Sequence, residues 1–519
     1  MYLTQGLHRA LQQQPDRTAV YFGALRRSFA ELGDRVARLA GALQTLGMAS
    51  GDRVAMLAMN SDRYLEYQLG VPWGGGVLNP CNVRWSVAEI VYSLKDSGSL
   101  ILIVDDAFKA MVEAIRRDTP SIRQVIYAGD SELPAGMHHY ETLLAKHAPI
   151  ADVCREGDDL LGIFYTGGTT GFPKGVMLSH ANLFASGMSL LGEGISPRGS
   201  VYLHAAPMFH LADFGISIPQ FLAGNAHAII PAFKPEAVLE AIARDRVTDV
   251  LLVPTMIQML VDHPAMQAGH DISSLKRVVY GASSISEAVL DRAMAALPGV
   301  EFFQAYGMTE LSPVATINPA WYHTAEGRKA GKLRSGGRAS FGTEVRIVDE
   351  LGVPVPLGTV GEVAVRGPNV MLGYWNKPEQ TAAALRNGWM HTGDGAYMDA
   401  DGFIFVVDRL KDMIKSGGEN VFSAEVENAL AQHAAVAACA VIGIPSDEWG
   451  EAVHAVVVAK PGASASGDEL IAHCKTLIAG YKCPRTIELR DALPLSGAGK
   501  ILKTVLRKPF WEGRSTQIG

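Results

Sequence analysis

The feature that most constrains the fold is a run of glycines, threonines and one lysine behind an apolar stretch. The segment Tyr165–His180 reads YTGGTTGFPKGVMLSH. Glycines allow backbone N–H groups to approach an anion, threonine hydroxyls add donors, and Lys174 adds positive charge. The preceding Leu160–Phe164 is apolar enough for a buried strand, and a helix is predicted from Asn182. A glycine-rich loop between a strand and a helix predicts a polyphosphate site, whereas a plain surface loop of turn formers fits less well.

Length and charge narrow the class of protein. The chain has 519 residues, of which 48% are hydrophobic and 19% charged, as expected for a soluble enzyme with two or more domains. The net charge of −7 argues against a nucleic-acid partner. The five cysteines lack metal-site spacing, which indicates a reducing compartment. Neither a signal peptide nor a transmembrane segment is predicted, and the expected location is cytoplasmic.

Strand-like and helix-like stretches alternate through the first 300 residues. This alternation predicts parallel sheets covered by helices, the α/β class. The predicted strands are Arg53–Met59, Leu100–Asp105, Gln124–Ala128, Val201–Ala205, Val250–Val253 and Arg277–Tyr280. The predicted helices include Phe29–Leu46, Pro235–Arg246 and Ser286–Leu297.

The pattern changes near residue 340. Polar and apolar residues alternate in Thr343–Val348 and in Gly361–Arg366, and a turn lies between the two segments. This pattern predicts a small antiparallel β element of the barrel kind. The last part of the chain, about 110 residues, mixes helices and strands and is compact enough for a separate domain. The expected architecture is a large N-terminal domain of parallel and mixed sheets plus a small β-barrel, and a small mobile α+β C-terminal domain. The predicted bounds are 1–408, with the barrel at 341–408, and 409–519.

Three further segments place polar groups where chemistry is plausible. Gln304–Glu310 reads QAYGMTE after a strand-like run, Trp389–Asp394 reads WMHTGD, and Leu493–Lys503 reads LPLSGAGKILK. Each also has a simpler interpretation: a solvated glutamate, an aspartate that caps its own turn, and an exposed, inert lysine.

In their order along the chain, these segments resemble the motifs of the adenylate-forming superfamily. That superfamily contains acyl-CoA synthetases, adenylation domains of peptide synthetases, and luciferases. The glycine-rich run is similar to its nucleotide loop and not to the P-loop of NTPases, because Lys174 stands between Pro173 and Gly175. The resemblance extends over nearly the whole chain. It favours the acyl-CoA synthetase branch, of the fatty acyl-CoA or aryl-acid CoA ligase type.

The resemblance implies a site for ATP and Mg²⁺. Tyr306 is expected to stack on adenine, Thr309 to contact the α-phosphate, and Glu310 to bind the metal, since Mg²⁺ prefers oxygen ligands. Asp394 and Arg409 are expected at the ribose. The implied cofactor-binding residues are Thr166, Gly167, Gly168, Thr169, Thr170, Gly171, Lys174, Gly281, Ala282, Ser283, Gln304, Ala305, Tyr306, Gly307, Met308, Thr309, Asp394, Arg409, Gly417 and Gly418.

The resemblance also implies how catalysis is divided between the domains. Lys500 matches the lysine that bridges the attacking carboxylate and the α-phosphate, where its charge stabilises the in-line transition state. Lys411 matches the hinge of the C-terminal domain. The loop Lys415–Asn420 matches the segment that admits coenzyme A, and Lys415 is counted with the catalytic residues. A lysine acetyltransferase acting on Lys500 would remove its charge, and such an enzyme is included among the expected partners.

The acyl-binding pocket is the least constrained prediction. His210 lies in Pro207–Gly215, is expected beside the pocket and the thioester site, and is counted with the catalytic residues. A histidine in an apolar stretch is, however, more often a core residue. The turn Tyr280–Ser284 also fits an ordinary strand-to-helix connection. The residues expected to line the pocket are Phe214, Val253, Met256, Tyr280 and Val314. Such a lining admits an alkyl chain or an aromatic ring.

The predicted activity is an ATP-dependent, AMP-forming acid–thiol ligase. It would form an acyl-adenylate and then an acyl-CoA thioester, with medium- or long-chain fatty acids as the first choice of substrate. The alternatives are an aryl-acid ligase for feruloyl-, coumarate- or benzoate-like acids, and a free-standing adenylation enzyme that loads a carrier protein. A luciferase-like oxygenase ranks last because no feature marks it. The oligomeric state is left open, with a homodimer as one option.

Overall fold

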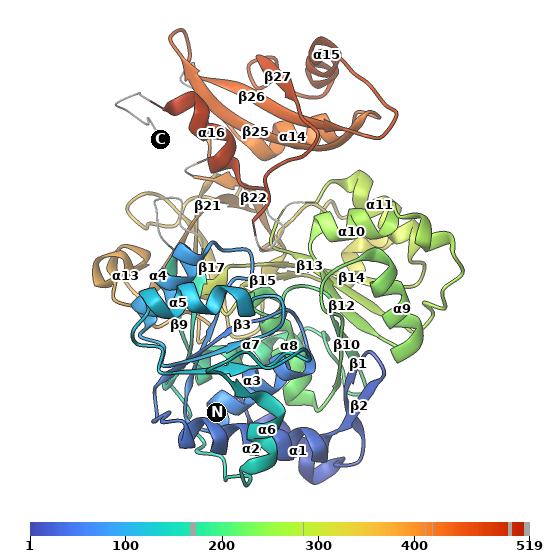
Figure 1. The fold of residues 1–519 in the computed structure, drawn as a ribbon. Coiled ribbons are helices and arrows are strands. Elements are labelled where there is room, and N and C mark those ends of the chain that lie inside the picture. Colours follow the sequence, from blue (N-terminus) through green and yellow to red (C-terminus); the bar gives the residue numbers. More distant parts are fainter. Residues whose placement is uncertain (167–172, 284, 411, 418, 497–500, 513–519) are drawn as a thin grey trace.

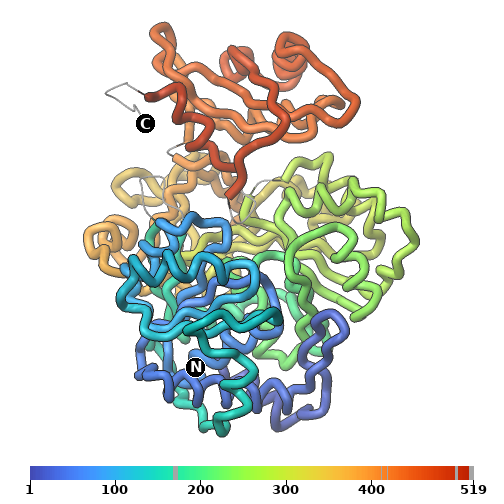
Figure 2. Tube along the Cα trace, viewed as in Figure 1, coloured from blue at the N-terminus to red at the C-terminus, as the bar shows by residue number. Residues whose placement is uncertain are grey.

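The computed structural model describes residues 1–166, 173–283, 285–410, 412–417, 419–496 and 501–512. Two large mixed sheets, a smaller five-stranded sheet and a C-terminal unit make up the fold (Figure 1). The C-terminal unit, drawn in orange and red, lies above the rest of the chain in Figure 2.

The first large sheet has eight strands in the order β19-β9-β8-β4-β3-β5-β6-β7. The strands from β8 to β7 run parallel, and β9 and β19 are antiparallel additions at one edge. All four residues of β5 are buried, because helices cover both faces of a parallel sheet. The strands are β3 (Arg53–Leu57), β4 (Val77–Pro80), β5 (Ile101–Val104), β6 (Gln124–Tyr127), β7 (His138–His139), β8 (Leu160–Thr166), β9 (Lys174–Ser179) and β19 (Gly373–Tyr374).

The second large sheet has nine strands in the order β16-β15-β14-β13-β12-β10-β11-β1-β2. Its central strands are parallel, and β2, β15 and β16 are antiparallel edges. The strands are β1 (Thr18–Phe22), β2 (Leu25–Ser28), β10 (Val201–His204), β11 (Ala226–Ile229), β12 (Asp249–Leu252), β13 (Arg277–Gly281), β14 (Glu301–Tyr306), β15 (Thr316–Asn318) and β16 (Arg338–Ala339).

Helices pack on both large sheets, and the largest apolar core joins the two. That core includes Leu39, Leu69 and Phe214 from three different helices, together with strand residues such as Val54 and Ile229. The helices of this part are α1 (Gln5–Gln13), α2 (Phe29–Thr45), α3 (Asp62–Trp73), α4 (Val87–Ser97), α5 (Val112–Asp118), α6 (Tyr140–Lys146), α7 (His180–Gly192), α8 (Leu211–Ala223), α9 (Pro235–Asp245), α10 (Pro254–Val261), α11 (Glu287–Ala296) and α12 (Ala325–Arg328).

The predicted small β element is an open antiparallel sheet of five strands. Its order is β17-β18-β21-β20, with β22 paired to β21. No pairing joins β17 to β20 in the part of the chain that the structure describes, so the sheet is half of a barrel. Its elements are β17 (Glu344–Val348), β18 (Gly361–Arg366), α13 (Pro378–Ala384), β20 (Leu385–Arg386), β21 (Trp389–Met398) and β22 (Ile404–Arg409).

The C-terminal unit has its own sheet and its own core. The sheet runs β24-β23-β26-β25, with β27 parallel to β26, and Val426, Val441 and Val453 lie in its apolar core. The Gln258 side-chain amide donates to the Ala437 carbonyl oxygen at 3.0 Å and so ties this unit to α10. The elements are β23 (Ile414–Ser416), β24 (Glu419–Val421), α14 (Ser423–Ala431), β25 (Val436–Ser446), β26 (Gly450–Ala459), α15 (Gly467–Leu477), β27 (Thr486–Leu489) and α16 (Lys503–Trp511).

The segment after the glycine-rich run differs from the sequence prediction. The predicted loop joins two antiparallel strands, β8 and β9, with Thr166 opposite Lys174, and it does not lead directly into a helix. Val176 and Leu178 are fully buried on one face of β9, an alternation typical of a strand. The helix follows at His180, where Ser179 and Asn182 form a capping box.

Candidate active site

The end of β14 and the turn behind it carry the largest group of predicted nucleotide contacts. A β-carbon on Gly281 would lie 2.1 Å from the Ala305 carbonyl oxygen, and one on Gly307 would lie 2.0 Å from that of Pro313. Glycine is therefore needed where β13 ends beside β14 and where the turn doubles back. The predicted residues of this turn are Gln304, Ala305 and Tyr306 in β14, then Gly307 and Met308, and then Thr309 and Glu310 in the short helix η3 (Thr309–Leu311).

The turn after β13 holds the other predicted adenine-side residues, Ala282 and Ser283. Ala282 has φ 68°, a left-handed conformation that is costly for a residue with a side chain. Such conformations persist where the surrounding structure enforces them, and they are frequent at functional sites.

Glu310 is a buried carboxylate held by a tyrosine from another sheet. The Tyr374 hydroxyl of β19 donates to Glu310 Oε1 at 2.8 Å, and Lys174 Nζ lies 4.8 Å from the centre of the Tyr374 ring. Burial raises the pKa of Glu310, while the Tyr374 hydrogen bond and the charges of Lys174 and Arg409 act in the opposite direction. A lysine of the glycine-rich hairpin, a carboxylate and a tyrosine thus meet at one place.

Tyr306 and Asp394 form the second polar contact of the site. The Tyr306 hydroxyl donates to Asp394 Oδ2 at 2.8 Å, and the Asp394 backbone N–H donates to the Thr392 hydroxyl oxygen at 3.1 Å. Asp394 and Arg409 are opposite each other on β21 and β22, with Arg409 Nε 3.7 Å from Asp394 Oδ1. Burial, followed by the Asp394 charge, raises the pKa of Tyr306, so the phenol remains protonated. The structure therefore brings together Tyr306, Asp394 and Arg409 from three separate motifs.

A contact from the C-terminal unit reaches the same region. Arg84 Nη1, in the loop between β4 and α4, donates to the Ser496 carbonyl oxygen at 2.8 Å. The next residue, Trp85, packs edge-on against Tyr165 with ring centres 6.4 Å apart. Tyr165 immediately precedes Thr166, where the glycine-rich hairpin begins. Ser496 of the C-terminal unit therefore lies near the base of that hairpin.

Other predicted residues lie elsewhere or outside the described residues. Lys415 and Gly417 belong to the C-terminal unit, where the Lys415 N–H donates to Glu451 Oε2 at 2.9 Å and the Gly417 N–H to the Trp449 carbonyl at 2.8 Å. Their described hydrogen bonds thus run within that unit and not to the Glu310 region. The predicted residues outside the described ranges are Gly167, Gly168, Thr169, Thr170, Gly171, Lys411, Gly418 and Lys500.

His210 caps the start of α8. Its Nδ1 accepts a hydrogen bond from the Ala212 N–H at 3.1 Å, so the ring is oriented by the helix that it caps. One turn further, Asp213 is fully buried and binds His204 Nδ1 at 2.6 Å and the Tyr202 hydroxyl at 2.9 Å. These contacts fix α8 against β10 and thereby the position of His210.

The residues predicted to line the acyl pocket all lie in apolar cores. Val253, Met256 and Tyr280 belong to the core of the α9–α11 face, Val314 to a neighbouring cluster, and Phe214 to the large core, stacked on Phe164. The Tyr280 hydroxyl donates a hydrogen bond to His323 Nε2 at 2.8 Å, and the Tyr280 ring packs in the apolar core.

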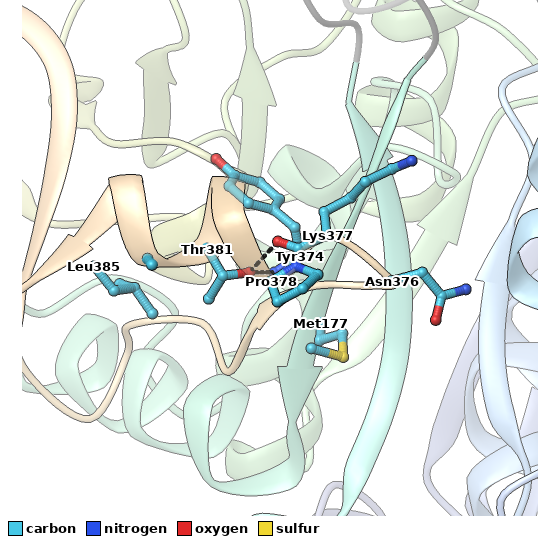
Figure 3. Close-up of a pocket in the computed structure, with 8 residues that line it drawn as sticks. Met177, Tyr374, Asn376, Lys377, Pro378, Thr381 and Leu385 are labelled. Carbon is cyan, nitrogen blue, oxygen red and sulfur yellow. Dashed lines mark hydrogen bonds between the residues drawn. The ribbon is translucent and has the colours of Figure 1, made fainter.

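Tyr374 also lines a shallow cavity of about 430 Å³, whose lining residues are drawn in Figure 3. The Thr381 hydroxyl accepts from the Tyr374 N–H at 2.9 Å and donates to the Lys377 carbonyl at 2.9 Å, which fixes the wall formed by α13. None of the predicted acyl-pocket residues lines this cavity. It is bounded by Met177, Tyr374, Asn376, Lys377, Pro378, Thr381, Ala382 and Leu385.

Sequence reasoning did not assign Tyr374 or Arg84 to the site. Tyr374 lies in a segment that reads GYWNKPE, and nothing local shows that its hydroxyl reaches Glu310, 64 positions away. Arg84 lies 412 positions from its partner. Neither residue could have been assigned to the site without the tertiary structure.

Comparison with known proteins defines the class of protein. Residues 7–375 match the AMP-binding enzyme family, and residues 425–500 match the AMP-binding enzyme C-terminal domain. The chain therefore belongs to the AMP-binding enzyme family, within the acyl-CoA synthetase branch of the adenylate-forming superfamily. The resemblance found in the sequence is confirmed.

Two curated relatives and one solved structure resemble this chain over most of its length. A feruloyl-CoA synthase of Amycolatopsis sp is 43% identical over 505 residues, 97% of this chain and 98% of the relative. The fatty acid–[acyl-carrier-protein] ligase ScoC of Streptomyces coeruleorubidus is 36% identical over 89% of this chain and 87% of the relative. The solved anthranilate CoA ligase AuaEII, in complex with anthranoyl-AMP, superposes with a TM-score of 0.90 at 27% identity, over 98% of this chain and 97% of that one. The predicted fold class is thus confirmed.

Proposed function

We propose that this enzyme joins a carboxylic acid to coenzyme A in two steps at the Glu310–Asp394 site. In the first step a carboxylate oxygen bonds to the α-phosphorus of ATP, and the bond to the β-phosphate oxygen breaks with release of pyrophosphate. In the second step the thiol sulfur of coenzyme A bonds to the acyl carbon, the thiol loses its proton, and AMP leaves. The observation that supports this most directly is the meeting of Lys174, Tyr374 and Glu310 next to the Tyr306–Asp394 pair.

The nucleotide would be held from two sides. Tyr306 is suited to pack against the base, because its ring ends β14 while its hydroxyl is fixed by Asp394. The second oxygen of Asp394, with Arg409 3.7 Å away, is suited to the ribose hydroxyls. Lys174 lies at the end of the glycine-rich hairpin. Its positively charged ammonium group would bind the negatively charged phosphates.

The residues around Glu310 fit a magnesium ion bound to the phosphates. Glu310 is a buried carboxylate that faces lysine and arginine charge and carries a hydroxyl donor on one oxygen, and carboxylate oxygens are the donors that Mg²⁺ prefers. Glu310 would hold the ion. When bound, Mg²⁺ neutralises charge on the phosphates during the displacement.

The C-terminal unit would serve the two steps in two poses. In the pose for the first step Lys500 would approach the hairpin, and the Arg84–Ser496 hydrogen bond supports this because Ser496 stands four positions before Lys500 in the sequence. Lys415 and Gly417 bond within their own sheet in this pose and would approach coenzyme A after rotation about Lys411. The division into 1–408 and 409–519, with Lys411 as hinge, is part of this proposal.

The proposed substrate is an aromatic acid of the hydroxycinnamate kind. The feruloyl-CoA synthase, at 43% identity over nearly the full length of both chains, favours an aryl acid. Val253, Met256 and Tyr280 lie together in one apolar core, and a pocket opening between them would accept a ring. The sequence alone placed fatty acids first, and the relative named as a fatty acid ligase keeps a medium- or long-chain fatty acid as the second candidate.

The test is AMP formation across acids from acetate to palmitate, together with benzoate, coumarate and ferulate. We expect the highest kcat/KM for coumarate or ferulate in the presence of coenzyme A. A maximum at octanoate to palmitate would favour the second candidate. Pyrophosphate release without coenzyme A, followed by transfer only to a phosphopantetheinyl carrier protein, would replace the ligase proposal by carrier loading.

A further inference from the structure

The outer face of the five-stranded sheet carries a small basic cavity. Its volume is about 230 Å³, and its walls include Arg346, Arg386, Trp389 and His391. Sites for drug-sized ligands usually measure about 300–1,000 Å³, so this cavity suits a smaller molecule. It lies outside the Glu310 region, since none of its walls is a predicted nucleotide contact.

Two buried donors in this cavity lack acceptors. The Nε atoms of Arg346 and Arg386 are both buried and have no hydrogen-bond partner in the described part of the chain. A buried donor without an acceptor is costly, so such atoms indicate a partner that the protein alone does not supply. Their presence in the same cavity points to one acceptor-rich ligand.

The guanidinium groups are held in place before any ligand binds. The central carbon of the Arg346 guanidinium lies 3.2 Å from the centre of the Trp389 ring, over the face of the indole. Arg386 Nη2 donates to Glu362 Oε2 at 2.8 Å. Because stacking and this ion pair already restrict both side chains, binding would cost little additional side-chain entropy.

The local charges do not cancel. Glu362 is shared by Arg386 and by His391, whose Nδ1 lies 2.7 Å from Glu362 Oε2. Arg346 has no carboxylate partner among the described ion pairs, and burial together with the nearby Arg366 charge lowers its pKa. Arg366 on the same face differs, since Glu344 binds it at 2.7 Å. Arg346 therefore has no ion-pair partner of its own among the described residues, and it shares the charge of Glu344 with Arg366.

We propose that this cavity binds a small phosphate-class anion, inorganic phosphate or pyrophosphate, between Arg346 and Arg386. Planar guanidinium groups bind phosphate oxygens through paired N–H bonds, a geometry that a lysine point charge does not reproduce. The site is separate from the phosphate-binding part of the catalytic centre. Glu362 connects the two regions, because its Oε1 accepts the Gly393 N–H at 2.9 Å, next to Asp394.

The test is calorimetric titration of the full-length protein with phosphate and with pyrophosphate. A saturating Mg²⁺ complex of α,β-methylene-ATP occupies the catalytic centre, and chloride and acetate at equal ionic strength serve as reference anions. We expect one saturable site for phosphate, pyrophosphate or both, and none for acetate. The tighter of the two binders identifies the ligand. Absence of any saturable site would overturn the proposal.

Variants locate the site. Arg346→Gln and Arg386→Gln should each weaken binding by about tenfold, since each removes one charge-assisted pair. Arg346→Lys keeps the charge and the aliphatic stem and should weaken binding by about threefold, so a folding defect in the glutamine variant does not decide the result. Arg117→Gln removes an arginine that is not part of the cavity wall and that pairs with its neighbour Asp118, so it serves as the control and should change the affinity by less than about twofold. Equal losses in all three glutamine variants would mean general electrostatic attraction and would contradict the proposed site.

Discussion

Arg84 and Ser496 lie 412 positions apart, yet the Arg84 guanidinium donates to the Ser496 carbonyl oxygen at 2.8 Å. This bond joins the C-terminal unit to the loop beside Tyr165. We propose that this contact belongs to the pose for adenylation.

Arg84→Gln should slow adenylation selectively. Loss of an exposed charged hydrogen bond costs about 1 kcal/mol, so ATP–pyrophosphate exchange should fall about fivefold. Thioester formation from supplied acyl-adenylate should change less, because that step needs the other pose. Arg117→Gln, an exposed arginine paired with its neighbour Asp118, is the control. If both half-reactions fall equally, the contact does not select a pose.

Lys500→Ala should abolish adenylation while thioester formation from supplied acyl-adenylate persists. The ammonium group is needed where the carboxylate meets the α-phosphate and not where the thiol meets the carbonyl, so we expect pyrophosphate exchange to drop by at least about 10²-fold. Lys503→Ala is a poor control because Lys503 pairs with Glu427 at 2.8 Å, whereas the exposed Lys508 offers a suitable one. Equal loss of both half-reactions would refute the assigned role.

Tyr374→Phe should raise the Mg²⁺ concentration needed for half-maximal adenylation. The hydroxyl helps to keep Glu310 ionised, and without it the pKa of that buried carboxyl should rise further. We expect a shift of about threefold, larger at pH 6 than at pH 8 because more Glu310 is then protonated. Glu310→Gln should shift the Mg²⁺ requirement more strongly, with little change in the KM for the acid. An unchanged Mg²⁺ titration for both variants would exclude Glu310 as the ligand.

The stability of the fold should fall as the pH decreases from 6.5 to 4. His323 is buried, donates from Nδ1 to the Pro319 carbonyl, and accepts the Tyr280 hydroxyl at Nε2. Burial lowers its pKa from 6.5 to about 4. Above pH 6.5 both the folded and unfolded states are neutral at this residue. Below it the unfolded state binds the proton first, so up to about 3 kcal/mol is lost by pH 4.

His323→Gln supplies the check on this titration. Glutamine offers an acceptor to Tyr280 but does not titrate, so the dependence of the urea midpoint on pH between 6.5 and 4 should become flatter. His180 is also buried, with its pKa lowered to about 4, and the double variant should be flatter still. A pH dependence identical to that of the native protein would show that neither histidine contributes.

The local sequence pattern was sufficient to predict several strands and helices. The predicted strands at Arg277–Tyr280 and Gly361–Arg366 and the helix at Phe29–Leu46 agree with the structure to within one residue at each end. Apolar periodicity and capping residues act over a few positions, so they are readable in the sequence. The hairpin strand Lys174–Ser179 was not predicted, because the glycine-rich residues before it indicated a loop that leads into a helix.

The sequence by itself determined the family, the order of its motifs and the residue types proposed for ATP and magnesium, because these depend on short segments with fixed spacing. Only the tertiary structure decided which groups meet. Tyr374 reaches Glu310 because β19 joins the edge of the first sheet at β9, and Asp394 faces Arg409 because β21 and β22 pair in that register. Strand pairing likewise sets the positions of Arg346 opposite Ala364 and of Arg386 opposite Trp389. Contacts between distant segments depend on strand order and register, which no local pattern encodes.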